Sequence, residues 1–403
     1  MQVVPKTELL AIHGGKPVRD RLLPYGRQSI DAEDIAAVVE VLRSDWITTG
    51  PKVAEFEEAF AARVGSRWAV SVSSGTAALH AAAFAAGLGP GDEAITTPLT
   101  FCATANCVAY TGAKPVFADI VPGTLLIDPA AVGSKTNLRT KAILPVDYAG
   151  QPADLDEIMA LAERRGLVVI EDACHALGAG YRGRRVGSIA HLSVFSFHPV
   201  KHVTTGEGGM VTTDDEKLAR RLRMFRNHGI DSDARQRQSA GQWFYAMEEL
   251  GFNYRLPDAA CALGLSQMKK LDANLARRRE LARRYHEAFR QVPGVKTLQV
   301  SEDRKPAWHL YPVQIESGVI RAERGEVFRA LRAENIGVNV HYVPVHLHPY
   351  YQRQFGHKPG EYPVSEAAYE RLLSLPMFHG MSDADAGDVI AAVNKVFSHY
   401  AHA

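Results

Sequence analysis

Short apolar runs and amphipathic segments alternate along the first two thirds of the chain. Runs such as 68–74 (WAVSVSS) and 93–98 (EAITTP) have the length and composition of strands, and segments such as 76–87 between them carry apolar residues at helical spacing. This alternation predicts βα units and a mostly parallel sheet. We expect seven strands in that sheet, at residues 68–74, 93–98, 115–120, 141–150, 167–173, 191–197 and 208–213.

Helical patterns also flank this region. Residues 31–43 place apolar side chains on one face behind an acidic first turn, and a loop follows. Residues 263–292 form a long amphipathic, arginine-rich pattern, in which we interpret the run 277–279 (RRR) as the solvent-facing side. Further on, the pattern predicts strands at 307–315 and 338–344 around a helix at 325–337.

The predicted fold class is α/β, with a large domain whose mostly parallel sheet has seven strands and a smaller C-terminal α+β domain. The large domain is expected over residues 1–265, including an N-terminal extension at 1–23. A connecting helix follows at 266–292, and the small domain at 293–403.

Composition and charge exclude several classes of protein. With 403 residues, 46% of them apolar, the chain can bury a large core. Its 46 basic and 45 acidic residues nearly cancel, and no basic block is interleaved with aromatic residues, so nucleic acid is not an expected partner. The four cysteines and the histidines lack metal-ligand spacing. Neither a signal peptide nor a membrane span is visible, and we expect a cytoplasmic protein without a membrane partner.

One lysine and one carboxylate carry the chemistry. Asp172 follows the apolar run LVVI, and such a buried carboxylate needs a partner to offset its desolvation. Lys201 stands in the stretch SVFSFHPVKHVTTGEGGMVTT. Pyridoxal 5'-phosphate (PLP) would use both residues, because a lysine holds the cofactor aldehyde as a Schiff base while an aspartate keeps the pyridine nitrogen protonated.

Other residues suit the remaining parts of the same cofactor. Gly75 and Thr76 open an alanine-rich helix after a strand, where free amides and the helix dipole favour a phosphate, although small residues also open helices for packing reasons. Ser196 is close enough to the lysine to reach the phosphate. Phe101 can stack on a planar ring, although a lone phenylalanine is more often core. His175 can lie against the cofactor, although a structural role is the default for a single histidine.

Three motifs resemble the sugar-nucleotide aminotransferases of the DegT/DnrJ/EryC1/StrS family. They are IEDACHALGA, FSFHPVKHVTTGEGGMVTT and GFNYRLPD, and the resemblance extends from about residue 24 to 400. It implies the aspartate aminotransferase-like fold (fold type I), PLP as cofactor and a homodimer with shared active sites. It also implies that Asn253 reaches the cofactor phosphate of the other subunit. Relatives with histidine in place of Lys201 are dehydratases, so the lysine here implies amino transfer.

Within this family the chain most resembles the transaminases of pseudaminic acid biosynthesis. That implies amino transfer from L-glutamate to C4 of a UDP-linked 4-keto-6-deoxy N-acetyl sugar, giving UDP-4-amino-4,6-dideoxy-N-acetyl-β-L-altrosamine. Residues 10–24, however, resemble members that act on other keto sugars or cyclitols. The candidates for substrate contact are Tyr25, Arg27, Thr48 and His341.

Two alternatives stay open at this level. One is an aminotransferase of the same family that acts on another nucleotide-linked 3- or 4-keto sugar. The other is a protein of this fold that has lost catalysis and serves as a ligand-responsive regulator. The combination of Lys201, Asp172, Ser196 and Asn253 in one chain favours an enzyme.

Overall fold

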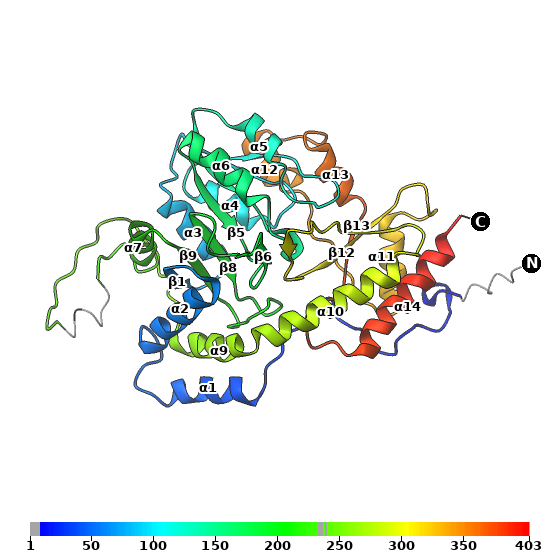
Figure 1. Cartoon of the computed structure of the whole chain (residues 1–403), viewed down its shortest axis with the longest axis horizontal. Coiled ribbons are helices and arrows are strands. Elements are labelled where there is room, and N and C mark those ends of the chain that lie inside the picture. Colours follow the sequence, from blue (N-terminus) through cyan, green and yellow to red (C-terminus); the bar gives the residue numbers. More distant parts are fainter. Residues whose placement is uncertain (1–8, 233–236, 238–239, 403) are drawn as a thin grey trace, which may run out of the picture.

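A seven-stranded sheet forms the centre of the larger part of the molecule, as predicted (Figure 1). The computed structural model describes residues 9–232, 237 and 240–402; residues 1–8 of the predicted N-terminal extension lie outside this range. The strand order is β1-β9-β8-β5-β4-β2-β3, and only β9 runs antiparallel to its neighbours. The strands are β1 (Trp68–Val72), β2 (Glu93–Thr96), β3 (Lys114–Phe117), β4 (Thr140–Leu144), β5 (Val168–Asp172), β8 (Leu192–Ser196) and β9 (Gly209–Thr213).

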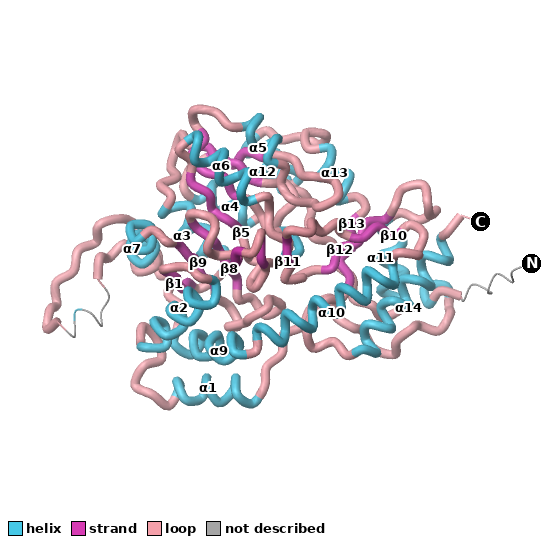
Figure 2. The backbone as a smooth tube through the Cα atoms, in the orientation of Figure 1, coloured by secondary structure: helices cyan, strands magenta, loops and turns pink. Residues whose placement is uncertain are grey.

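Helices cover both faces of this sheet, because successive side chains of a strand point to opposite faces. Ile170 packs against the side with α3, α4 and α7, whereas Val169 packs against the side with α6. Figure 2 shows the strands enclosed between helices. The helices of this part are α1 (Ala32–Leu42), α2 (Pro51–Val64), α3 (Gly75–Ala85), α4 (Ala103–Tyr110), α5 (Pro129–Lys135), α6 (Leu155–Arg165), α7 (Glu216–Phe225) and α9 (Asp258–Lys269).

The C-terminal part contains a second sheet and its own apolar core. Its strands β10 (Val295–Thr297), β12 (Tyr311–Ile315) and β13 (Leu372–Leu375) are all antiparallel. The predicted strand at 338–344 is wrong: this segment contributes only an isolated bridge between Asn339 and Ser374. The helices are α10 (Leu271–Phe289), α11 (Arg324–Ala333), α12 (Pro349–Phe355), α13 (Pro363–Tyr369) and α14 (Asp383–Tyr400). The predicted domain boundaries stay predictions.

Helix α10 corrects our interpretation of the arginine run. Arg278 is fully buried, and its neighbours Arg277 and Arg279 donate hydrogen bonds to the carbonyls of Met381 and Gly178. The helix connects the two parts of the molecule, so that neighbouring chain covers the side that spacing alone assigned to solvent (Figure 1). The predicted single helix over 263–292 is also two helices, α9 and α10, which meet at Lys270.

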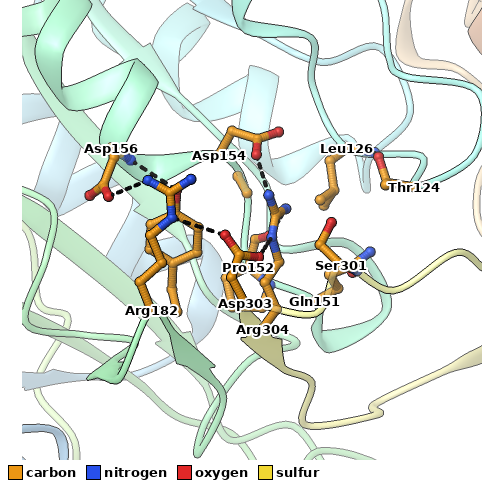
Figure 3. Close-up of polar contacts among 12 residues, drawn as sticks. Thr124, Leu126, Gln151, Pro152, Asp154, Asp156, Arg182, Ser301, Asp303 and Arg304 are labelled. Atoms are coloured by element: carbon orange, nitrogen blue, oxygen red, sulfur yellow. Dashed lines mark hydrogen bonds and ion pairs between the residues drawn. The ribbon is translucent and has the colours of Figure 1, made fainter.

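An ion-pair cluster attaches residues 301–305 to the larger part (Figure 3). Arg182 donates to Asp156 at 2.8 Å and to Asp303 at 2.9 Å, and Arg304 pairs with Asp154. The Arg304 side chain is only 4% exposed, so its contacts are far less screened by water than those of Arg182. In the same place β11 (Arg304–Lys305) pairs with the hairpin of β6 (Gly180–Tyr181) and β7 (Arg184–Arg185).

Candidate active site

The sheet topology brings the predicted site residues to one edge. Strands β5 and β8 are parallel neighbours, in register at Asp172 and Val194, so both end at the same side. Strand β1 runs in the same direction, because β1 and β8 each pair antiparallel with β9. The ends of these three strands lead into Asp172, Ser196 and Gly75. In sheets of this type the carboxyl ends of the strands are where ligands bind.

A cavity of about 560 Å³ lies at this edge. It brings together residues from the larger part and from the loop 339–342 of the C-terminal part. Of the described predicted residues, Arg27, Thr48 and Asn253 are exposed and lie outside its lining, and their roles stay predictions. The predicted residues that line it are Tyr25, Gly75, Thr76, Phe101, Asp172, His175, Ser196, Lys201 and His341.

Asp172 is buried at the wall of this cavity. Its carboxylate accepts hydrogen bonds from the Thr104 hydroxyl at 2.7 Å and from the Cys174 backbone N–H at 3.2 Å. Within the described part of the chain it has no ion-pair partner at 4 Å or closer. Neutral donors orient the carboxylate without neutralising it, so a cationic N–H group such as a protonated pyridine nitrogen would complete its environment. The residue therefore fits the role expected of it with PLP.

Lys201 lies in the turn after β8, where its backbone N–H bonds to the carbonyl of His198. Burial lowers the pKa of the Lys201 ammonium, against the opposing effects of Cys174 and Asp172. A lowered pKa increases the fraction of neutral amine, which is the form that attacks an aldehyde and accepts a proton. The position of Lys201 in the cavity with Asp172 thus fits covalent binding of a carbonyl cofactor.

The start of α3 forms a close cradle beside these two residues. The Ser74 hydroxyl caps the helix by accepting from the Ala77 N–H at 3.0 Å. A Cβ atom on Gly75 would lie 2.8 Å from the Cβ and 3.0 Å from the Oγ of Ser196, so only glycine fits there. The N-terminal end of the helix, a glycine backbone and the hydroxyl of Ser196 are suited to a phosphate group.

Aromatic side chains form the remaining walls. His175 contacts Tyr342 through its Nε2 at 3.1 Å from the hydroxyl, and its ring centroid lies 4.4 Å from that of His309. Burial, together with Lys201, holds the pKa of His175 well below its usual range, so the ring is neutral. Phe101 is 55% exposed, which argues against a purely core role, and its ring lies 5.9 Å from Tyr342.

The C-terminal part contributes His341 next to Tyr25. Their ring centroids are 5.3 Å apart, and His341 Nδ1 lies 2.8 Å from the Ser374 hydroxyl. Burial lowers the pKa of His341 to about 4, which leaves a neutral hydrogen-bonding ring. Both residues line the cavity; Tyr25 comes from the N-terminal loop and His341 from the loop before α12.

Our sequence reasoning missed several residues of the cavity. The Thr104 hydroxyl orients Asp172. A threonine in a predicted helix carries no signal of such a role in the sequence. Tyr342 was visible beside His341 in VNVHYVP, and an aromatic hydroxyl in a predicted site loop could have been considered. His309 and Asn339 reach the site only through the packing of the C-terminal part.

A second acidic pair lies behind Asp172. The carboxyl groups of Asp147 and Glu171 are fully buried, and Glu171 accepts from the Ser193 hydroxyl at 2.5 Å. Within the described residues, one oxygen of each carboxyl has no hydrogen-bond donor. Burial raises the pKa of both groups, and the nearby charge of Glu171 raises that of Asp147 further. One proton between the two carboxyls satisfies both oxygens.

Metal-binding clusters and membrane-spanning helices are both absent from the described residues. No group of three His, Cys, Asp or Glu side chains within that part of the chain is placed to hold a metal ion. No helix there is both long and apolar enough to cross a membrane.

The fold and the geometry of the cavity define a class: the fold type I aminotransferases, whose solved structures match this chain over nearly its whole length. The chain belongs to the DegT/DnrJ/EryC1/StrS aminotransferase family, whose sequence model matches residues 28–394. The residues that form the sheet, the cavity and the C-terminal part therefore all lie within the family match.

Individual relatives cover almost the full chain. The spore coat polysaccharide biosynthesis protein SpsC of Bacillus subtilis is 48% identical over 380 residues, which is 94% of this chain and 98% of SpsC. The Helicobacter pylori aminotransferase PseC, which is involved in pseudaminic acid biosynthesis, is 33% identical and superimposes with a TM-score of 0.87 over 94% of this chain and 100% of PseC. The PLP form of the sugar aminotransferase Spr1654 of Streptococcus pneumoniae is 30% identical, with a TM-score of 0.88 over 94% and 99% of the two chains.

Proposed function

We propose that this protein is a PLP-dependent aminotransferase that moves an amino group from L-glutamate to a nucleotide-linked keto sugar. The observation that supports it most is the placement of Lys201 and Asp172 in one cavity, at the ends of neighbouring strands. Family membership and the PLP form of the Streptococcus pneumoniae relative support the cofactor.

The residues divide the chemistry between them. PLP, when bound, withdraws electrons from a carbon attached to its captured amine, so that a proton can leave that carbon. Asp172, oriented by Thr104, would stabilise a protonated pyridine nitrogen. Gly75, Thr76 and Ser196 would hold the phosphate. The Lys201 amine would remove the proton from the α-carbon of the donor and return a proton to C4 of the sugar.

The finer proposal concerns the sugar. We propose a UDP-linked 4-keto-6-deoxy N-acetyl sugar as acceptor, aminated at C4 to UDP-4-amino-4,6-dideoxy-N-acetyl-β-L-altrosamine, and the likeness to PseC over 94% of this chain supports it. The second candidate is another nucleotide-linked 3- or 4-keto sugar. The higher identity to SpsC, whose name connects it with spore coat polysaccharide, favours this second candidate.

A homodimer with shared active sites is part of the proposal. The segment 240–252 extends away from the body of the molecule (Figure 1) and exposes large apolar side chains, including Trp243 at 85% and Leu250 at 77%. Exposed apolar surface of this kind is typical of a protein contact. Asn253 ends this segment, is exposed, and pairs through its backbone with Asn227, so that its side chain is available to a second subunit.

The test is a transamination assay on the purified protein with PLP. L-glutamate and a panel of UDP- and dTDP-linked 3- and 4-keto sugars are supplied, and the amino sugar is identified by mass spectrometry. We expect product and a change of the PLP absorbance on adding glutamate. Lys201→Ala should abolish both, whereas Lys269→Ala, which removes an exposed lysine of α9, should leave both unchanged. Unchanged absorbance and no product in the native protein would favour the regulator alternative.

A further inference from the structure

Arg278 of α10 is a buried cation without an acidic partner. The residue is 0% exposed, and its Nη1 donates to the carbonyls of Trp308, His309 and Met377 at 3.1, 3.3 and 3.0 Å. Among the described residues its Nε and Nη2 have no hydrogen-bond partner, and no carboxylate lies within ion-pair distance. A charge buried in this way is costly, so its position needs an explanation beyond packing.

The backbone that Arg278 holds enters the active site. Residues 307–309 are fixed from a second side by the Ala307 N–H, which donates to Gly150, and by the His309 N–H, which donates to Ala149. Trp308 has a φ of 52°, a left-handed conformation that a bulky residue adopts only when its surroundings enforce it. The arginine and the Ala149–Gly150 turn together enforce it.

The turn that carries Lys201 contacts the same segment, residues 307–309, from a third side. His202, which follows Lys201, lies with its Nε2 3.0 Å from the Ala307 carbonyl. The ring of His309 then lies 4.4 Å from that of His175 and 5.7 Å from that of His202. The segment 307–309 is thus a bridge with Arg278 on one side and Lys201–His202 on the other.

The groups around Lys201 also bear on its protonation. Asp172 and Cys174 favour the ammonium form, whereas burial and the positive charge of Arg278 favour the neutral amine. The same charge lowers the pKa values of His202 and His309, after burial. The titratable groups around Lys201 are Asp172, Cys174 and His175 at the end of β5, His198 and His202 beside it, Tyr25 and Glu207, His309 on the bridge, and His341 and Tyr342 from the C-terminal part.

We propose that Arg278 is a positioning residue of the aminotransferase site, which holds the bridge 307–309 with Trp308 in its left-handed conformation and keeps a positive charge near Lys201. The proposal deepens the proposed function, since it assumes that Lys201 captures the cofactor. It assigns the arginine two effects: the ring of His309 is kept against His175, and the neutral amine of Lys201 is favoured near neutral pH.

The experiment measures covalent capture of PLP by the cofactor-free protein as a function of pH, followed by absorbance. In Arg278→Met we expect the midpoint of capture to move upward by about 0.5 to 1 pH unit, because loss of the nearby charge lets the lysine keep its proton longer. In Arg278→Lys the midpoint should return most of the way to the native value, since a positive charge remains. The pH profile of kcat should move in the same direction.

Arg279→Met is the matched control. This neighbour also donates to carbonyls, those of Pro306 and Gly178, but it has no hydrogen bond to residues 307–309 and is not among the charges that act on Lys201. An unmoved midpoint in Arg278→Met, or an equal shift in Arg279→Met, would overturn the proposal. If Arg278→Met fails to fold, Arg278→Gln, which lacks the charge but keeps a donor, serves for the same measurement. Capture of PLP by Lys201→Ala in this assay would instead refute the proposed function, whatever the arginine variants show.

Discussion

At the scale of single residues, the environment of a side chain decides what it can do chemically. Asp172 and Glu171 are consecutive carboxylates of β5, yet they face opposite sides of the sheet. Asp172 reaches the cavity and accepts hydrogen bonds from two neutral donors. Glu171 lies in the interior and shares its environment with Asp147. Two consecutive carboxyl groups thus have different surroundings, one at the wall of the cavity and the other in the interior.

Replacing Asp172 tests its proposed contact with the cofactor. Asp172→Asn keeps the size and the contact to Thr104 but cannot stabilise a protonated pyridine nitrogen. We expect turnover to fall on the order of 10²- to 10⁴-fold with little change in the melting temperature. Asp128→Asn, which keeps an acceptor at the N-cap of α5, is the control and should behave like the native protein. Turnover within a few-fold of native in Asp172→Asn would refute the role.

The buried pair Asp147–Glu171 predicts a dependence of stability on pH. Because the folded-state pKa values are raised above the unfolded ones, the pair stabilises the fold at low pH, and this stability is lost as pH rises from about 4 through the raised values. Asp147→Asn replaces the shared proton by an amide N–H. The free energy of unfolding of the variant, relative to that of the native chain, should therefore increase with pH, by up to about 1.4 kcal/mol per unit.

Urea unfolding of both chains between pH 5 and pH 9 measures this difference. The comparison of variant with native chain is needed because the buried histidines act in the opposite direction. Their lowered pKa values give stability that grows as pH rises toward about 6.5 and is constant above it. Parallel stability curves for the two chains would show that Asp147 and Glu171 share no proton.

At the scale of elements, the start of α3 shows how a helix end forms a close cradle at the edge of the cavity. Ser74 satisfies one of the free N–H groups, and the close approach of Gly75 to Ser196 removes the space that a side chain would fill. Most residues of the helix behind it are small, which lets the helix pack tightly on β8 and β9. Tight packing keeps the cradle in place when a ligand is absent.

Gly75→Ala tests this cradle. Its Cβ would lie 2.8 Å from the Cβ of Ser196, and relief of such a contact costs about 1–3 kcal/mol. We expect PLP affinity to fall roughly 10- to 100-fold, measured by titration of the cofactor-free protein. Gly387→Ala in α14 meets nothing within 4 Å and should leave affinity unchanged while stabilising the helix by about 0.5–1 kcal/mol. Equal affinities in the two variants would contradict the assignment.

In helix α10, too, the surroundings decide the role of each side chain. Its three consecutive arginines differ in burial because the helix runs between two packed bodies rather than along a surface. Arg277 reaches Met381, Arg278 the bridge 307–309, and Arg279 the carbonyl of Gly178. One turn of helix therefore holds three separate segments of chain in place.

At the scale of the whole molecule, the proposed dimer predicts complementation between two inactive chains. In a mixed dimer of Lys201→Ala and Asn253→Ala, one site has both residues intact only if Asn253 acts on the partner subunit. We expect co-expressed chains to recover up to about half of the native activity, while each variant alone has little.

Differently tagged chains, purified as mixed dimers, provide the material for this assay. Size-exclusion chromatography with light scattering establishes the dimer first. Activity that stays at the level of the single variants would show that Asn253 acts within its own chain or not at all. A monomer in solution would refute the shared site directly.

Much of the fold could be predicted because it depends on local pattern. The period-2 and helical rhythms predicted the seven strands and the helix at 31–43, which the structure confirms. The prediction of a strand at 338–344 failed, since residues 339–342 line the cavity and the segment pairs with β13 only through the bridge of Asn339 with Ser374. The prediction of a single helix at 263–292 failed because no proline or glycine marks the break at Lys270 in the sequence.

The sequence by itself determined the reactive residue types, the order of strands and helices, and the family. Those properties depend on neighbours along the chain, where spacing and composition act directly. Only the tertiary structure decided that nine predicted residues share one cavity and that His309 and Tyr342 form walls of that cavity. It also decided that Arg278 is buried. These features depend on contacts between segments more than a hundred residues apart, such as Tyr342 with His175, for which local pattern carries no signal.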